Sequence, residues 1–284
     1  MQELGTDRAF VEDQYSDAAK LRTRIETHQR YSQGDTDRIL DDATRALHLS
    51  PALRMLDVGC GAGSWHARAA QAGARLVGVD LMPGMIREAR LGGADLQPTP
   101  SFCQADAQAL PFRDATFDRV LCAGVLYHVP DCERALREIR RVLRPGGRAV
   151  ISTNGAFAMR RIYELHTSAA RELGFDPLPI TSGHFTMDDL PLVRRVFPTA
   201  ERYILEGALV FETAEPALSF YATNRIDALR DPPSDASHRP RLLPAMRERI
   251  EAIIEREGSF TVSKSVGYFV ATADPLSSDP ATPC

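Results

Sequence analysis

The sequence predicts an α/β fold in which helices flank a mostly parallel sheet, and three observations lead to this prediction. Apolar runs of strand length recur through the first half of the chain, at 53–58, 75–80, 101–105, 117–123 and 147–152. Segments with helical spacing or turn signals separate them, as parallel strands joined by crossovers require. A glycine-rich turn follows the first run directly. Finally, 284 residues with 44% apolar content can bury one substantial core.

Composition and charge exclude several classes of function. The formal net charge of -4 provides no global cationic field that would recruit nucleic acid. The five cysteines are odd in number and show no zinc-ligand spacing, so we expect no metal and a reduced, cytoplasmic setting. No apolar run approaches the roughly 20 residues that span a bilayer, and the N-terminus is acidic, so we expect neither membrane insertion nor export.

Helical spacing is clear on both sides of the glycine turn. Residues 16–33 predict one helix, and a second follows Asp35 and ends at Pro51, so two helices are expected before the first strand. Between the fourth and fifth strands we predict a helix over 132–143, with Asp131 as its N-cap and residues 144–147 ending it.

After Thr153 the alternation stops, and the elements become less regular. We predict helices at 157–173, 187–197 and 243–257 and strands at 201–210 and 265–273. The expected organisation is a helical lid at 1–49, a core at 50–153, a remainder at 154–273 with cap insertions at 155–200 and 211–262, and a disordered tail at 274–284.

The glycine turn is the central chemical signal. Asp57-Val58-Gly59-Cys60-Gly61-Ala62-Gly63 runs from a strand through the turn toward a helix. Glycines permit a tight turn and close approach of the backbone to a ligand, and the helix start offers unpaired N–H groups. Asp57 either contacts a ligand or caps the N–H groups of the turn itself.

The next two strands also end in acids. Asp80 follows the turn by about 20 residues, where a carboxylate can accept both hydroxyls of a ribose. Asp106 and Ala107 follow the third strand, where the carboxylate can accept from an adenine amino group and the backbone N–H can reach a ring nitrogen. The glycine spacing is GxGxG rather than the GxGxxG that holds a pyrophosphate, and no phosphate-binding basic residue lies nearby.

Five segments in this order and spacing resemble the consecutive motifs of class I S-adenosylmethionine-dependent methyltransferases, near the ubiquinone-biosynthesis and methyltransferase type 11 group. They are LDVGCGAG, VGVD, QADAQALPF, FDRVLCAGVLYHV and REIRRVLRPGG. The resemblance covers about residues 50–153. It implies a Rossmann-like fold with a seven-stranded, mostly parallel sheet, a C-terminal antiparallel hairpin, an N-terminal helical lid and an inserted helical cap.

The resemblance also implies which residues hold S-adenosylmethionine. Asp57, Gly59, Cys60, Gly61 and Gly63 would surround its methionine part. Asp80 would hold the ribose, Leu81 and Met82 would pack near adenine, and the backbone at Ala123 would meet the amino group. Tyr15, Arg24 and His28 would contact the cofactor from the N-terminal helix.

His128 and its neighbour Tyr127 are the candidate catalytic residues, because they follow the fourth strand at the carboxyl edge of the sheet. His128 is either a general base for an acceptor hydroxyl or a positioning residue. His166 and His184 are expected to be exposed and without function.

The expected function is methyl transfer to the O, N or C atom of a small molecule in bacterial biosynthesis, in a monomer or a homodimer. Three alternatives stay open: a non-methylating reaction in the same cofactor site, a nicotinamide-dependent oxidoreductase, and a binding protein without catalysis.

Overall fold

The protein is described by a computed structural model that covers residues 6, 19–179, 184–223 and 225–273. The helices of this part are α2 (Ala19–Tyr31), α3 (Ile39–Leu47), α4 (His66–Gln71), α5 (Pro83–Gly93), α6 (Cys132–Val142), α7 (Arg160–Glu172), α8 (Leu190–Val196), α9 (Ala214–Tyr221) and α10 (Arg239–Glu257). The strands are β1 (Ser32–Gly34), β2 (Arg54–Val58), β3 (Arg75–Asp80), β4 (Ser101–Gln104), β5 (Phe117–Ala123), β6 (Leu143–Asn154), β7 (Glu201–Phe211) and β8 (Phe260–Thr272). The tail and Tyr15 lie outside the described residues.

The sheet is mostly parallel, as the alternation predicts. Its strand order is β1-β7-β8-β6-β5-β2-β3-β4, and the pairs β4–β3, β3–β2, β2–β5 and β5–β6 are all parallel. The strand order reverses between β2 and β5, because the chain moves outward through β3 and β4 and then returns to the other side of β2. Ligands of open α/β sheets bind at such a switch point, at the carboxyl ends of the strands.

The predicted C-terminal hairpin is confirmed, but within the described residues the sheet has eight strands, one more than the seven expected. Tyr203 lies beside Gly267, and Glu206 accepts from Ser265, so β7 and β8 run in opposite directions. Ser32–Gly34 pairs antiparallel with β7 and forms the extra strand β1. Two helices, α2 and α3, precede the first core strand β2 as predicted, but β1 between them was not predicted, because the edge of β7 offers backbone partners that sequence spacing does not reveal.

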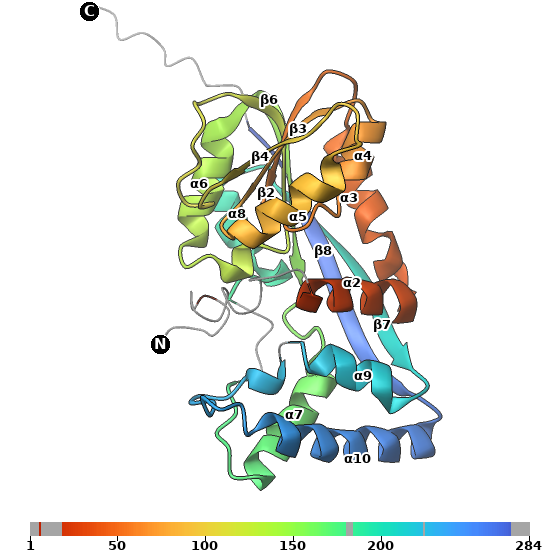
Figure 1. Cartoon of the computed structure of the whole chain (residues 1–284). Helices are drawn as coiled ribbons and strands as arrows, with labels where there is room; N and C mark the ends of the chain where they lie inside the picture. The colour runs from red at the N-terminus through yellow and green to blue at the C-terminus, as the bar shows by residue number, and fades with distance from the viewer. Residues whose placement is uncertain (1–5, 7–18, 180–183, 224, 274–284) are drawn as a thin grey trace, which may run out of the picture. The chain divides into compact units, whose positions relative to one another are not determined.

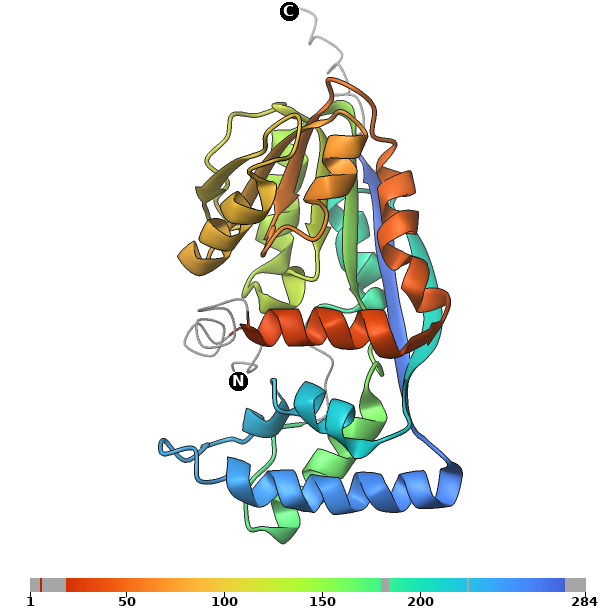
Figure 2. The same cartoon turned by 45° about the vertical axis from the view of Figure 1, so that its right-hand side comes forward.

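The chain divides into two compact units, and the division falls inside β6, β7 and β8. The first comprises residues 1–39, 154–186 and 204–266, and the second comprises 40–153, 187–203 and 267–284. In the second unit, α3, α4 and α5 lie on one face of the sheet while α6 and α8 lie on the other (Figures 1 and 2). In the first, α10 packs on α7 and α9, around a core that includes Phe211, Tyr221 and Met246.

Most helices begin and end close to their predicted bounds. Asp131 caps α6, since its side chain accepts from the N–H of Arg134. The RPGG segment belongs to β6 rather than to a turn before it. Helix α9 was not predicted, and α10 begins at Arg239 instead of residue 243, because two prolines near its start obscure the helical spacing.

Candidate functional site

Two loops meet at the switch point of the sheet, and both follow strands that the sequence predicts. Residues 59–63 follow β2 and residues 124–128 follow β5, the two strands between which the order reverses. The ideal Cβ position at Gly59 lies 2.3 Å from Cγ2 of Val125. The two loops are therefore in direct contact, and a side chain at residue 59 would push them apart.

The glycine loop has a backbone that other residues rarely adopt. The φ angles of Gly59, Gly61 and Gly63 are 69°, 53° and 97°, all in the left-handed region. The N–H groups of Gly59 and Cys60 donate to the carbonyl of Val79 at 2.7 and 2.9 Å, which ties the loop to β3. The result is a rigid cradle whose inner surface is backbone, as close approach of a ligand requires.

Asp80 connects this cradle to the end of β3. Its Oδ2 accepts from the N–H of Gly61 at 2.9 Å, and its Oδ1 accepts from the N–H of Met82 at 2.8 Å. A carboxylate offers about four lone-pair sites, so each oxygen keeps room for a further donor. The side chain that orders the loop can thus also accept the two hydroxyls of a ribose.

Burial raises the pKa of the Asp80 carboxyl above its ordinary value of 3.8. The hydrogen bonds from the N–H groups of Met82 and Gly61 act in the opposite direction, but their effect on the pKa is smaller. A protonated carboxyl loses acceptor capacity, so affinity for an adenosine ligand should fall as the pH is lowered through this raised pKa. We expect calorimetric titration of S-adenosylhomocysteine to show weaker binding at mildly acid pH than at neutral pH. In Asp80→Asn the same pH range should have little effect, and an equally steep loss in that variant would contradict the assignment.

His66, at the start of α4, lies beneath the glycine loop, and no sequence motif indicates this position. Its Nε2 lies 3.4 Å from Oδ2 of Asp57, both side chains are almost fully buried, and neither atom makes a hydrogen bond. The ideal Cβ position at Gly63 would lie 2.5 Å from Nδ1 of His66. The imidazole therefore requires glycine above it, a constraint that only the tertiary packing reveals. Buried polar atoms without partners usually have a specific cause, and a bound ligand is one.

Asp106 follows β4, as the sequence predicts, but hydrogen bonds from Gln108 already take most of the acceptor positions of its carboxylate. Gln108 donates to it from the backbone N–H at 2.8 Å and from Nε2 at 3.2 Å to each oxygen. Ala107 beside it is buried. Asp106 is thus held as an acceptor at the edge of the sheet, next to the end of β3, where the carbonyl of Asp80 accepts from the N–H of Ala105.

The remaining predicted contacts around the cradle differ in exposure. Leu81 is 37% exposed, so its side chain is accessible for packing against a flat ring, while Met82 is buried. Cys60 is buried, and burial strongly raises the pKa of its thiol, so it is a neutral filler of the loop and not a nucleophile. Ala123 ends β5 beside the second loop.

Tyr127 and His128 lie in a short 3-10 turn, Leu126–His128, directly after β5. Their ring centroids are 4.4 Å apart in an edge-to-face arrangement, and the Tyr127 hydroxyl lies 3.2 Å from the ideal Cβ position at Gly124. Both side chains are partly exposed. The structure therefore places the two candidate catalytic residues at the switch point, on the loop that touches Gly59.

Arg24 and His28 belong to the other unit, and their predicted contact with a cofactor stays a prediction. His28 is packed edge-on against Phe220. Burial lowers the pKa of His28 to about 3, with the nearby cations Lys264 and Arg24 adding to the effect. His28 is therefore neutral at physiological pH.

The prediction that His166 is exposed is wrong, because its side chain is fully buried. Nδ1 lies 2.7 Å from the Tyr221 hydroxyl, and Nε2 lies 3.2 Å from the carbonyl of Ala228. A carbonyl only accepts, so Nε2 carries the proton and Nδ1 accepts from Tyr221. The sequence of α7 is rich in polar residues, so its helical spacing alone does not show that His166 faces the core of its unit.

Fold and site together define a Rossmann-like protein with a glycine-rich cradle and two acids at the carboxyl edge of its parallel strands. Residues 56–151 match the family described as a methyltransferase domain. The match identifies this part of the chain as a methyltransferase domain, and together with the fold it supports a class I S-adenosylmethionine-dependent methyltransferase.

Individual relatives give the same family. The 27-O-demethylrifamycin SV methyltransferase of Amycolatopsis mediterranei is 28% identical over 247 residues, 84% of this chain and 83% of that protein. Methyltransferase GfsG of Streptomyces halstedii is 36% identical over 121 residues, which are 41% of this chain and only 43% of that protein. The crystal structure of the [4+2]-cyclase SpnF shares the fold, with a TM-score of 0.55 and 19% identity over 93% of this chain and 96% of that one.

Two further observations concern the described residues alone. Within them, no three or more His, Cys, Asp or Glu side chains are grouped as metal ligands would be. None of the helices in this part of the chain is both long and apolar enough to cross a bilayer.

Proposed function

We propose that this protein transfers the methyl group of S-adenosylmethionine to a small-molecule acceptor. The observation that carries the proposal is the Asp80 carboxylate, which orders the glycine cradle through Gly61 and keeps acceptor sites for a ribose. When bound, S-adenosylmethionine supplies a methyl group on a cationic sulfur that is already strongly electrophilic. The protein then has to align the acceptor with that methyl group and exclude water, and such alignment can lower a barrier by about 7–11 kcal/mol.

The residues of the site fit each part of this cofactor. Asp80 would hold the ribose, Asp106 and Ala107 the adenine edge, and Leu81 and Met82 the adenine faces. Asp57 is a buried carboxylate whose Oδ2 lacks a hydrogen bond, so it suits the cationic amino group of the methionine part. The backbone of Gly59, Cys60, Gly61, Gly63 and Ala123 would line the methionine part without side-chain interference.

His128 and Tyr127 are the residues we propose for the acceptor. An acceptor hydroxyl gains from proton removal, which a neutral imidazole performs well near pH 7, whereas a neutral amine needs no base. His128→Gln should therefore lower the transfer rate to a hydroxyl acceptor by about 10²–10⁴-fold. If the rate loss is the same at all pH values between 6 and 9, His128 positions the acceptor instead.

The test of the function is the mass of the product. The purified chain is incubated with S-adenosylmethionine and a panel of aromatic and polyketide hydroxyl acceptors, and we expect one acceptor to gain one methyl group while S-adenosylhomocysteine accumulates. Thermal-shift measurements with S-adenosylhomocysteine and with NADH separate the cofactor classes. Stabilisation by NADH alone would refute the proposal.

A second candidate is a non-methylating reaction in the same cofactor site. It is favoured by the fold shared with the [4+2]-cyclase SpnF. An acceptor that is rearranged without a change in mass, in a reaction that needs the cofactor but does not consume it, would establish this alternative.

The predicted organisation belongs to the same proposal: a lid at 1–49, a core at 50–153, a cap built from 155–200 and 211–262, and a cytoplasmic enzyme acting on a small molecule as a monomer or homodimer. Light scattering of the purified chain distinguishes the two assemblies.

A further inference from the structure

Gln108 connects the candidate adenine site to the start of α6. Its Nε2 donates to both oxygens of Asp106 at 3.2 Å, and its Oε1 accepts from the main-chain N–H of Asp131 at 3.1 Å. A main-chain N–H can only donate and an ionised carboxylate can only accept, so the amide of Gln108 has a single orientation. A flipped amide would lose both bonds.

This orientation determines which lone pair of Asp106 is left for a ligand. Oδ1 receives two donors, the backbone N–H of Gln108 and its Nε2, whereas Oδ2 receives Nε2 alone. Since each oxygen has about two lone-pair sites, the remaining acceptor position is on Oδ2. Asp106 can accept one more hydrogen bond there and can donate none.

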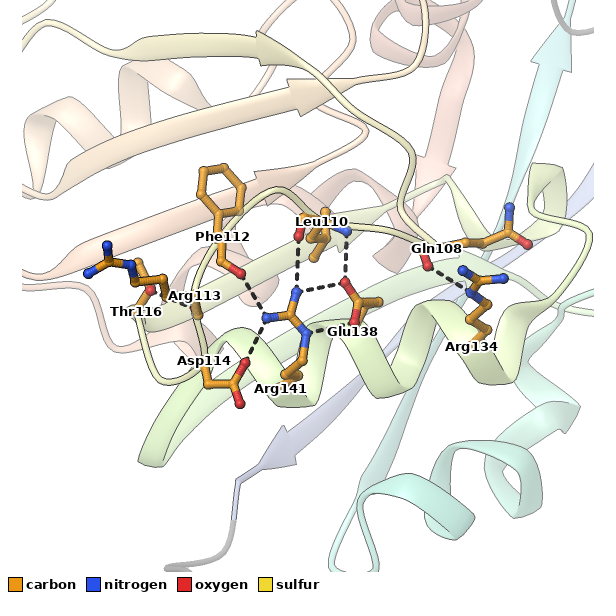
Figure 3. Close-up of polar contacts among 9 residues, drawn as sticks. All are labelled: Gln108, Leu110, Phe112, Arg113, Asp114, Thr116, Arg134, Glu138 and Arg141. Atoms are coloured by element: carbon orange, nitrogen blue, oxygen red, sulfur yellow. Dashed lines mark hydrogen bonds and ion pairs between the residues drawn. The ribbon is translucent and has the colours of Figure 1, made fainter.

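The segment that carries Gln108 is fixed by side chains of α6. The Nε of Arg134 donates to the carbonyl of Gln108 at 2.9 Å, and Glu138 accepts from the N–H of Leu110 at 2.8 Å (Figure 3). Arg141 lies between the carbonyls of Leu110 and Phe112 and donates to both (Figure 3). With its backbone held at these points, Gln108 cannot move away with Asp106.

We propose that Gln108 is a positioning residue that makes the cofactor site selective for a purine with a 6-amino group; this inference rests on the proposed function. The adenine amino group donates to Oδ2 of Asp106, whereas the 6-oxo group of hypoxanthine would place a second acceptor against it. A site built to hydrogen-bond a particular ligand group rejects ligands that cannot form that bond by large factors. Gln108 maintains the selectivity against 6-oxo purines because its hydrogen bonds hold the Asp106 carboxylate in one orientation, in which it can only accept.

The experiment compares two ligands, S-adenosylhomocysteine and its 6-oxo analogue, in two variants. Gln108→Glu keeps the acceptor for Asp131 but replaces the donor to Asp106 with a carboxylate. Two carboxylates at this distance do not both stay ionised, so one of them retains a proton, and with that proton on Oδ2 of Asp106 the O–H can donate to a 6-oxo group. Gln108→Ala removes both bonds. Gln71→Glu, an exposed site at the end of α4, introduces the same charge as a control.

The readout is the ratio of the two dissociation constants, measured by calorimetry at pH 7 on variants whose melting temperature is recorded. We expect wild type and Gln71→Glu to prefer S-adenosylhomocysteine by at least about a hundredfold, and both Gln108 variants to reduce that ratio by at least about tenfold. An unchanged ratio, or an equal loss of affinity for both ligands, overturns the inference. Failure of wild type to bind S-adenosylhomocysteine would instead refute the proposed function.

Discussion

Asp80→Asn is expected to weaken the binding of S-adenosylhomocysteine by at least about a hundredfold while the chain stays folded. Hydrogen bonds to a charged group contribute about 1.5–3 kcal/mol each, and the proposed ribose site has two of them. Asparagine has the shape of aspartate but only one accepting oxygen, so it cannot serve Gly61, Met82 and both hydroxyls. Each 1.4 kcal/mol is about a tenfold change in affinity, which gives the stated factor.

The matched control is Asp95→Asn, which makes the same change at an exposed site just beyond α5. Both variants should keep the circular dichroism spectrum of the wild type, and only Asp80→Asn should lose affinity in calorimetry. Alanine is a poorer test, because it releases the N–H groups of both Gly61 and Met82, whereas asparagine keeps one acceptor for them. Equal affinities of Asp80→Asn and wild type would remove Asp80 from the ribose site.

Gly59→Ala is expected to have the second largest effect, a loss of affinity for S-adenosylhomocysteine of about a hundredfold together with a lower melting temperature. A non-glycine residue in the left-handed region costs about 1–2 kcal/mol, and overpacking costs about 1–3 kcal/mol more. The new methyl group would meet Cγ2 of Val125 at 2.3 Å and Cγ1 at 2.9 Å. For a domain of this size the melting temperature should fall by about 5–10 °C, as measured by calorimetry.

Val125→Ala provides the internal test of this explanation. It removes the two nearest atoms and leaves only Cβ, at 3.1 Å from the introduced methyl group. The double variant Gly59→Ala/Val125→Ala should recover part of the affinity and stability, because the clash is relieved while the strained backbone remains. If Val125→Ala gives no recovery, contact between the two loops is not the cause of the loss.

Much of the cofactor site could be predicted from the sequence because it depends on local patterns. A strand followed by GxGxG, and strands that end in Asp80 and Asp106, indicate parallel strands whose carboxyl ends meet at one edge. The N-cap of α6 was predicted for the same reason, since capping depends on residues three positions apart.

Other features depend on residues distant in sequence, and spacing cannot reveal them. His66 meets Asp57 only once α4 packs beneath the loop, and Gln108 reaches Asp131 only because the segment after β4 lies along α6. The sequence around His166 is typical of a surface histidine, and only the fold places Tyr221 and Ala228 against its ring. Strand β1 needs the free edge of β7.

By itself, the sequence determined the parallel sheet, the glycine cradle and the acids placed around it, because backbone conformation and strand ends are encoded by neighbouring residues. Only the tertiary structure decided how Asp80 divides its lone pairs between the loop and a ligand, which residue holds Asp106, and why Gly59 and Gly63 tolerate no side chain. These properties arise from contacts between segments that the fold brings together.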